Sequence, residues 1–234
     1  MIKTKRRYRA AEVAVRGERF GIALDGRPAR TPAGAELIVP TRPLAEAIAG
    51  EFRAQGAELV PESMPLTRLA NAAIDRVKAG RQDIIADIAA YAESDLVCYR
   101  ANEPEDLVRA QAAASDPMLQ WVRERFGAEL RVGAGIMPVA QDPAGVAKLK
   151  TAAASFDDMM LTALYSTIKN CGSLVLALAL AEGRIDAREA LGLSQTEESY
   201  QAGRWGLDPV YAARREQLAR ELASAARFME LCRA

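Results

Sequence analysis

The chain has 234 residues, of which 50% are hydrophobic and 26% charged, a composition typical of a globular protein with a sizeable core. Its 31 basic and 31 acidic side chains cancel, so no global field favours binding to nucleic acid or to an anionic membrane. The sequence contains no histidine, which excludes Ser-His and Cys-His nucleophilic sites and removes the commonest general base and metal ligand.

The strongest local charge lies at the start of the chain. Five basic residues surround Tyr8, namely Lys3, Lys5, Arg6, Arg7 and Arg9. Such a cluster could be an arm that binds nucleic acid, but a frayed and solvated terminus explains it better. No apolar run follows it, so we expect no signal peptide.

The first 40 residues predict β-strands. The stretches "AEVAVR" (11–16), "RFGIALD" (19–25) and "AELIVP" (35–40) alternate apolar with polar residues or form short apolar runs bounded by Gly or Pro. Asp25-Gly26 suits the first hairpin turn, because glycine accepts the positive φ that such a turn demands. Thr31 to Gly34 predicts a second turn.

The segment "DGRPARTPAG" (25–34) contains both turns and raises the alternative of a phosphate-binding loop. A phosphate loop places its glycines on the turn into a helix, with several amides aimed at one point. Here both flanks are predicted strands, and Pro28 and Pro32 have no amide hydrogen to donate. We therefore interpret the segment as the corner of a sheet.

A helix is predicted next, with Thr41 as its cap and with Leu44, Ile48 and Phe52 on one face. Pro61 and Pro65 then indicate an irregular connection. We place a domain boundary there, which gives a β-rich N-terminal domain with one helix (1–63) and a helical domain (64–234).

The remainder predicts helices with repeated start signals. An apolar stripe covers Ile84, Ile88, Ala92 and Leu96, and a second covers Leu218, Leu222, Ala225, Met229 and Cys232. Helix starts are predicted at Asp116-Pro117 (ending at Gly127), Asp142-Pro143, Ser155 with Asp158, Ser194 with Glu197, and Asp208-Pro209. Gly172 is predicted to stop or kink a helix. The fold class is therefore α+β, with a small β-rich N-terminal domain followed by a larger all-helical C-terminal domain.

Cysteine spacing and hydropathy indicate the compartment. Cys98, Cys171 and Cys232 lie far apart with no CxxC pair, which suits a reducing compartment where cysteines act as small apolar fillers. The longest apolar run, "LVLALALA" (174–181), is far shorter than the roughly 20 residues of a membrane span. We expect a cytoplasmic protein without membrane insertion.

Two stretches contain polar and aromatic residues in a combination that folding alone does not require. In "PLTRLANAAIDRV", Arg68, Asn71 and Asp75 lie close together along one predicted helix. Internal ion pairing explains them most simply, with Asp75 bound to Arg68 or to a loop. The alternative is an enzyme that uses this cluster and nearby carboxylates around a small-molecule pocket.

The other stretch is "TEESYQAGRWGLD". Glu197 and Glu198 occupy the first turn of a short predicted helix, where the helix dipole favours acids. Tyr200 and Trp205 follow within one to two turns. A tryptophan alone is more often part of a core, but an acidic pair beside Tyr and Trp is also the composition of a protein–protein interface.

Six motifs occur in order and together resemble one family: "DGRPARTPAGAELIVPT", "LAEAIAGEFRAQG", "MPLTRLANAAIDRV", "DLVCYRA", "GSLVLALAL" and "EESYQAGRWGLD". They are similar to the assembly chaperones of the catalytic head of F-type ATP synthase, known in mitochondria as ATP synthase assembly factor two. The resemblance runs from about Tyr8 to Arg233.

The resemblance implies a non-enzymatic chaperone without cofactors. Its members bind the newly made α subunit and shield the surface destined for the β subunit, and they combine a β-rich with a helical domain. Relatives occur in mitochondria, in the matrix, and in α-proteobacteria. The Ala- and Arg-rich chain without a transit peptide is expected to be bacterial and cytoplasmic, and monomeric when free.

The resemblance also implies where the partner binds. An acidic position tied to function in the family falls on Glu198. A family tryptophan in the first helix is Phe52 here, and Gly203 stands where relatives often carry an acid. The candidate partner-binding residues are Glu198, Glu197, Tyr200, Trp205, Phe52 and Arg68.

Overall fold

The computed structural model describes residues 4–206 and 208–234, so Lys3 of the basic cluster and Leu207 of the last motif lie outside the described residues. The chain divides into two compact units. Unit 1 comprises Met1–Arg81, Asp157–Ala163 and Arg227–Ala234, and unit 2 comprises Gln82–Phe156 and Leu164–Ala226. The first stretch of unit 1 runs past residues 63 and 64, and our domain boundary there stays a prediction.

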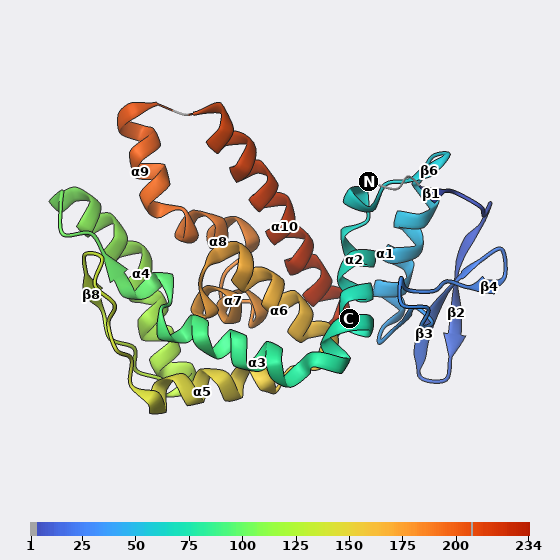
Figure 1. The fold of residues 1–234 in the computed structure, drawn as a ribbon, viewed down its shortest axis with the longest axis horizontal. Coiled ribbons are helices and arrows are strands. Elements are labelled where there is room, and N and C mark those ends of the chain that lie inside the picture. Colours follow the sequence, from blue (N-terminus) through green and yellow to red (C-terminus); the bar gives the residue numbers. More distant parts are fainter. Residues whose placement is uncertain (1–3, 207) are drawn as a thin grey trace. The chain divides into compact units, whose positions relative to one another are not determined.

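Unit 1 contains the predicted strands and the first helices (Figure 1). In chain order its elements are β1 (Thr4–Lys5), β2 (Ala11–Arg16), β3 (Arg19–Leu24), β4 (Arg27–Pro28), β5 (Ile38–Val39), α1 (Arg42–Arg53), β6 (Glu58–Leu59), the 3₁₀ turn η1 (Pro61–Ser63), α2 (Pro65–Ala72) and the π-helical turn η2 (Ala73–Val77). The helix α3 (Lys78–Glu93) follows. Strand β3 pairs antiparallel with β2, β4 and β5, and β1 pairs antiparallel with β6.

The hairpin turns depend on residues with positive φ. Asp25 and Gly26 have φ of 47° and 76° between β3 and β4, so the predicted turn forms. It is the second hairpin turn and not the first, because Gly17, with φ of 63°, already turns the chain between β2 and β3. At the next predicted turn the Gly34 amide donates to the Thr31 carbonyl at 2.9 Å.

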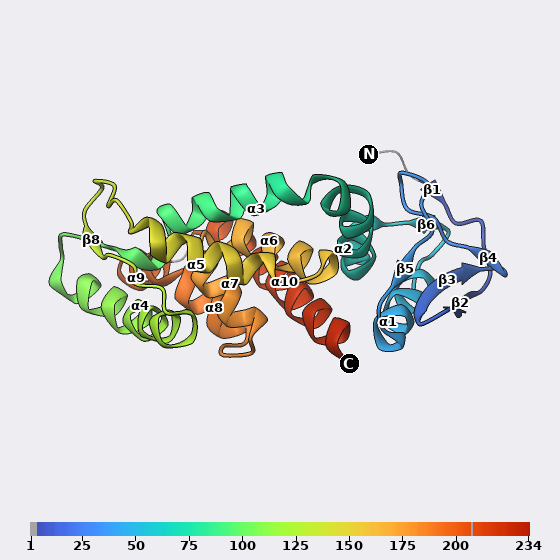
Figure 2. The same ribbon diagram turned by 90° about the horizontal axis from the view of Figure 1, so that it is seen from below.

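Helix α1 forms as its sequence predicts and lies against the sheet (Figure 2). The Thr41 side chain accepts a hydrogen bond from the Leu44 amide at 3.3 Å and caps the helix. The buried face includes Leu44, Ile48 and Phe52. Together with buried Ile22 and Val39 of the sheet, this face forms the apolar core of unit 1.

The described part of the basic terminus is not frayed. Residues 4–5 form strand β1, and the Arg6 guanidinium donates to the carbonyls of Tyr8 at 3.0 Å and Gln55 at 2.5 Å. The Tyr8 hydroxyl donates to the Phe52 carbonyl at 2.8 Å. Our interpretation of a frayed terminus is therefore wrong for these residues, because backbone pairing and the half-buried side chains of Arg6 and Tyr8 anchor them, although Lys5, Arg7 and Arg9 are exposed.

Unit 2 is helical apart from one short parallel strand pair, β7 (Tyr99–Arg100) with β8 (Gly133–Ala134). Besides most of α3, its elements are the 3₁₀ turn η3 (Leu96–Cys98), α4 (Glu105–Phe126), α5 (Pro143–Ala154), α6 (Asp158–Cys171), α7 (Leu174–Ala181), α8 (Ala187–Ser194), α9 (Thr196–Trp205) and α10 (Pro209–Arg233). The first turns of α6 and the last turns of α10 belong to unit 1. The small sheet-containing part followed by helices confirms the predicted α+β class.

Helix α7 is the centre of unit 2. All eight of its residues are buried, and it contacts α4 and α8. Its first turn is bound by Asp95, a fully buried carboxylate that accepts the Val97 amide at 3.2 Å and the Val175 amide at 3.0 Å. This carboxylate satisfies the amides that a buried helix start leaves unpaired. Within residues 4–206 and 208–234, no helix is both long and apolar enough to cross a membrane.

Several predicted helix boundaries differ from the observed ones. Asp116-Pro117 lies in the middle of α4, which begins at Glu105. Asp157, and not Ser155, caps α6, since its carboxylate accepts the Met160 amide at 2.8 Å. Ser194 ends α8, and the observed capping box joins Asp186 to Glu189. The starts at Asp142 and Asp208 and the stops at Gly127 and Gly172 are confirmed.

Candidate partner-binding surface

The acidic pair of the last motif lies in the first turn of α9, as predicted. Glu197 and Glu198 are both exposed. Glu197 accepts long hydrogen bonds from Gln201 at 3.2 Å and Gln111 at 3.4 Å. Glu198 makes no hydrogen bond or ion pair with any residue that the structure describes. Its carboxylate is therefore free to bind a cation from outside the chain.

Tyr200 joins α9 to α4 through a small polar network. Its hydroxyl donates to Asp106 at 2.7 Å, and it also accepts from the Arg204 guanidinium, which stands 5.5 Å from the Tyr200 ring centroid. The hydrogen bond from Tyr200 holds the pKa of Asp106 below its usual value. Tyr200 thus orients α9 on α4, and this explains its place in the motif without a direct contact with a partner.

Trp205 lies at the end of α9 and is 76% exposed. The expectation that a tryptophan usually belongs to a core is wrong at this position. An exposed indole contributes a large amphipathic contact area, and such residues are enriched at the centres of protein interfaces.

A groove of about 400 Å³ opens beside the acidic pair, and we call it the α9 groove. It is lined by Leu96, Tyr99, Arg100, Ala101, Asn102, Gln111, Ser115, Gly135, Ile136, Leu193, Ser194, Thr196, Glu197 and Glu198. These residues come from η3, β7 and the loop after it, α4, the loop after β8, the end of α8 and the first turn of α9, all in unit 2. In Figure 1, α9, α4 and β8 lie at one end of this unit.

The charge of the α9 groove is set by its two glutamates. Its one basic lining residue, Arg100, has a buried guanidinium that binds Asp116 at 2.5 Å and the carbonyls of Val97 and Tyr99 at 2.8 Å. This cation is therefore already neutralised and serves the fold. The groove keeps an uncompensated negative charge on Glu197 and Glu198.

The other two candidate residues belong to unit 1. Phe52 is only 8% exposed and packs edge-on against the Tyr8 ring at 5.8 Å between centroids. It can affect binding only through the fold. Arg68 is exposed on α2. The six candidates therefore do not form one cluster within either unit.

The cluster proposed as an enzyme site is used for structure. Asp75 accepts hydrogen bonds from the Thr31 hydroxyl at 2.6 Å and the Ala33 amide at 3.0 Å. The carboxylate is thus hydrogen-bonded to the sheet corner. This is one of the two structural roles predicted for it, namely binding to Arg68 or to a loop. Because the Ala33 amide already donates to this carboxylate, it is not available to a phosphate. This fits the interpretation as a sheet corner better than that as a phosphate-binding loop. Asn71 has a buried Oδ1 that accepts no hydrogen bond from the described residues.

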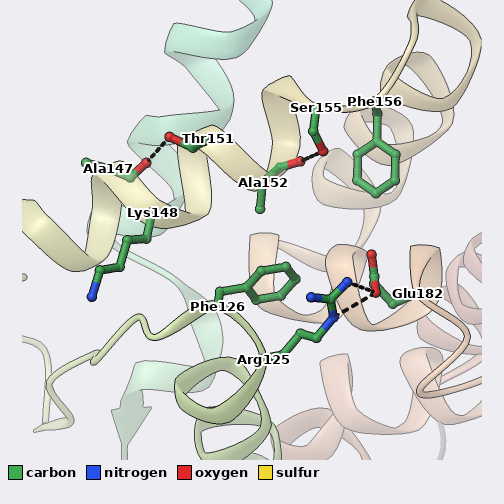
Figure 3. Close-up of a pocket in the computed structure, with 9 residues that line it drawn as sticks. All are labelled: Arg125, Phe126, Ala147, Lys148, Thr151, Ala152, Ser155, Phe156 and Glu182. Atoms are coloured by element: carbon green, nitrogen blue, oxygen red, sulfur yellow. Dashed lines mark hydrogen bonds and ion pairs between the residues drawn. The ribbon is translucent and has the colours of Figure 1, made fainter.

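A second cavity, of about 480 Å³, lies elsewhere in unit 2 (Figure 3). Its lining is Arg125, Phe126, Ala147, Lys148, Thr151, Ala152, Ser155, Phe156 and Glu182. Arg125 points at Glu182 and binds it at 2.8 and 3.0 Å, and Lys148 donates to the Gly127 carbonyl at 2.5 Å. Because its charged groups already have partners, this cavity has no unsatisfied charge comparable with that of the α9 groove.

Metal and thiol chemistry find no support in the described chain. No three His, Cys, Asp or Glu side chains among residues 4–206 and 208–234 are grouped as metal ligands. Cys98 and Cys171 are buried, and burial raises the pKa of each thiol to about 12, so neither is a reactive thiolate at neutral pH.

The apolar side of the α9 groove was not predicted from the sequence. Ile136 is 97% exposed, although it is aliphatic, and Leu96 is 42% exposed. Leu96 was expected to belong to the buried stripe of α3, but it lies on η3 beyond the end of that helix. An available signal was Ile136 itself, an aliphatic residue directly after Gly133 and Gly135 in a loop.

Comparison with known proteins identifies the family. The family described as ATP12 chaperone protein matches residues 5–123. The chain belongs to the ATP12 chaperone family. This confirms the resemblance to chaperones of ATP synthase assembly.

Individual relatives match most of the chain. The mitochondrial protein atp12 of Schizosaccharomyces pombe is 25% identical over 218 residues, which cover 88% of this chain and 75% of that protein. The crystal structure of Atp12 from Paracoccus denitrificans is 39% identical with a TM-score of 0.94, covering 98% of each chain, and an aspartate-to-lysine mutant of it matches equally. The Atu1473 protein of Agrobacterium tumefaciens is 36% identical with a TM-score of 0.92, covering 97% of this chain and 85% of that one.

Proposed function

We propose that this ATP12-family chaperone binds the unassembled α subunit of F-type ATP synthase and shields its β-facing surface until the catalytic head forms. A free subunit of a ring exposes a large, partly apolar interface that would otherwise aggregate. The chaperone acts without a cofactor, as a monomer when free and, in a bacterial host, in the cytoplasm. Binding and release take the place of catalysis.

The observation that carries the proposal is the unpaired carboxylate of Glu198 in the first turn of α9. The neighbouring acid Asp106 is already bound by Tyr200 and Arg204, whereas Glu198 is left exposed with no internal partner. A chaperone must leave its client, so a polar binding surface suits it better than a permanent apolar seam. An exposed glutamate beside Trp205 and the α9 groove gives such a surface.

The first experiment is co-expression of the chain with the α subunit of its host. We expect α to remain in solution and to co-purify with the chain. Loss of a desolvated ion pair at the interface costs about 2 kcal/mol or more, whereas a pair at the rim contributes roughly 0–1 kcal/mol. The Glu198→Lys variant should therefore bind α at least about tenfold more weakly, measured by titration calorimetry, with an unchanged thermal unfolding curve.

Glu18→Lys is the matched control. Glu18 lies in the turn between β2 and β3, is exposed, and has no partner among the described residues. It undergoes the same charge reversal away from α9 and should leave affinity unchanged. Equal weakening by both variants would mean that only net charge matters, and absence of any complex with α would contradict the proposed function.

The enzyme alternative has weaker support. Its central carboxylate, Asp75, accepts hydrogen bonds from the Thr31 hydroxyl and the Ala33 amide, which gives it a structural role at the sheet corner. Ligand-induced thermal shifts with nucleotides or phosphorylated metabolites, followed by turnover of a bound compound, would favour the enzyme over the chaperone.

A further inference from the structure

We propose that the α9 groove takes one short client segment that carries an arginine or lysine beside an apolar side chain. The cation binds Glu198 and Glu197, and the apolar side chain packs on Ile136 and Leu96. This inference rests on the proposed function, because the client supplies the segment, but it adds the chemistry by which that segment is recognised.

The acidic side of the groove selects the cation. Glu198 has no internal partner, the bonds from Gln111 and Gln201 to Glu197 are long, and the Arg100 cation is neutralised by Asp116 at 2.5 Å. A segment with acidic side chains, or a nucleic-acid backbone, would place like charges together at a cost. Charge complementarity thus favours a basic peptide.

The apolar side is held in place by the backbone. The Gly135 amide donates to the Arg100 carbonyl at 2.8 Å, next to the β7–β8 pairing. Gly135 has φ of 76°, and a Cβ there would stand 2.8 Å from the side-chain Nδ2 of Asn102. The positive φ, which glycine adopts without strain, lets the Gly135 amide reach the Arg100 carbonyl and so places Ile136, which is the next residue.

Ile136 leaves a large apolar surface in contact with water in the free protein, and a partner would cover it. At 97% exposure its side chain gains almost nothing from the fold, and Met137 beside it is 72% exposed. Covering an isoleucine side chain is worth roughly 1.5–3 kcal/mol. A volume of about 400 Å³ is in the range of sites that bind a few groups, which favours a short segment over a flat interface.

The first test measures α binding by groove variants. Because Ile136 packs on little of its own chain, Ile136→Ser should fold normally, and we expect at least tenfold weaker binding to α. Val15→Ser, a change of the same kind at a residue 58% exposed on β2, should bind as the unchanged chain does. Unchanged affinity of the Ile136→Ser variant would overturn the apolar half of the proposal.

The second test measures binding of short peptides to the α9 groove in the absence of the full-length client. Synthetic 15-residue peptides carry one arginine and one leucine, two or four residues apart, and matched peptides carry glutamate for arginine. By NMR titration we expect the arginine peptides to shift resonances of residues 96, 136 and 193–198, and the glutamate peptides to shift none. Both Glu198→Lys and Ile136→Ser should abolish these shifts.

The outcomes of the two tests are distinct. Arginine peptides that bind in the groove while full-length α does not would keep the groove and overturn the proposed function. Binding of α without discrimination between the two kinds of peptide would keep the function and overturn the groove. Equal binding of both peptides, insensitive to Glu198→Lys, would identify a merely apolar site and also overturn the proposal.

Discussion

Asp95 shows how much depends on single buried residues in this fold. Its carboxylate accepts amides on both sides, from Val97 and, 80 residues away in the sequence, from Val175. Burial raises its pKa from 3.8 to about 6, although hydrogen bonds from Ser173 and backbone amides act in the opposite direction. No local pattern predicts this role, because the helix start that Asp95 binds is defined only after folding.

We expect Asp95 to make stability depend on pH. Between about pH 4 and 6 the unfolded chain has lost this proton while the folded chain keeps it, so the contribution of Asp95 to the free energy of unfolding falls as pH rises through this window and is constant above it. A shift from 3.8 to about 6 corresponds to a change on the order of 3 kcal/mol.

The measurement compares urea unfolding of the unchanged chain with that of Asp95→Asn at pH 4, 5, 6 and 7. The amide does not titrate, so the stability advantage of the unchanged chain should shrink from pH 4 to pH 6 and then stay level. An advantage that is the same at all four values would show that Asp95 is ionised throughout.

The sequence predicted which residues belong to the candidate site better than it predicted their contacts and burial. Glu198 is implied by its motif, and its helix turn is predicted by "TEESY". Its lack of a partner, the burial of Phe52 and the exposure of Trp205 depend on which elements pack together. Such packing is set by contacts that are distant in sequence, and so the composition of the site could be predicted but its geometry could not.

Among elements, local start and stop signals are reliable only where packing agrees with them. Gly127 and Gly172 end helices because each adopts a positive φ that only glycine takes without strain. Asp116-Pro117 is also a strong start signal, yet α4 runs through it from Glu105 to Phe126. Buried Leu107, Met118 and Val122 lie on both sides of the proline, and their packing outweighs the loss of one backbone hydrogen bond.

The hydrogen bonds from the sheet corner to Asp75 of η2 hold two elements of unit 1 together. Asp75→Ala leaves the buried Thr31 hydroxyl without its acceptor and frees the Ala33 amide, so we expect a loss of about 1–3 kcal/mol in the free energy of unfolding. Thermal and urea unfolding measure it. Arg76→Ala, at the exposed neighbouring position, should change stability by less than about 0.5 kcal/mol.

A double-mutant cycle with Thr31→Val checks the cause. If the hydroxyl–carboxylate bond carries the loss, Asp75→Ala should cost less in the Thr31→Val background than in the unchanged chain. Strictly additive losses would mean that Asp75 stabilises the fold by another route.

For the molecule as a whole, the α+β class and the order of strands before helices follow from hydrophobic periodicity, and both are confirmed. The composition of the two units does not follow from it. Unit 1 also contains residues 157–163 and 227–234, which local patterns assign to the helical part. The Thr41 hydroxyl that starts α1 donates to the Leu231 carbonyl at 2.5 Å, a contact across 190 residues that no window of sequence reveals.

Removal of residues 227–234 should therefore destabilise unit 1 and not merely shorten α10. The deletion takes away the fully buried Phe228, the buried Met229 and the acceptor for Thr41. Loss of a buried aromatic side chain alone costs about 3–5 kcal/mol. Hydrogen exchange should show faster exchange throughout α1 and β3. Removal of only residues 233–234, which are exposed, is the control and should leave those amides protected.

Unit 1 is built from segments that lie far apart in the sequence, and this affects how it folds during synthesis. A ribosome releases the strands and α1 long before it has made residues 227–234, so unit 1 cannot be complete while the intervening segments are still being translated. Until then the apolar positions that Phe228 and Met229 will cover stay open to solvent or to other chains. A protein that protects another from aggregation thus passes through a stage in which it is itself exposed to the same hazard.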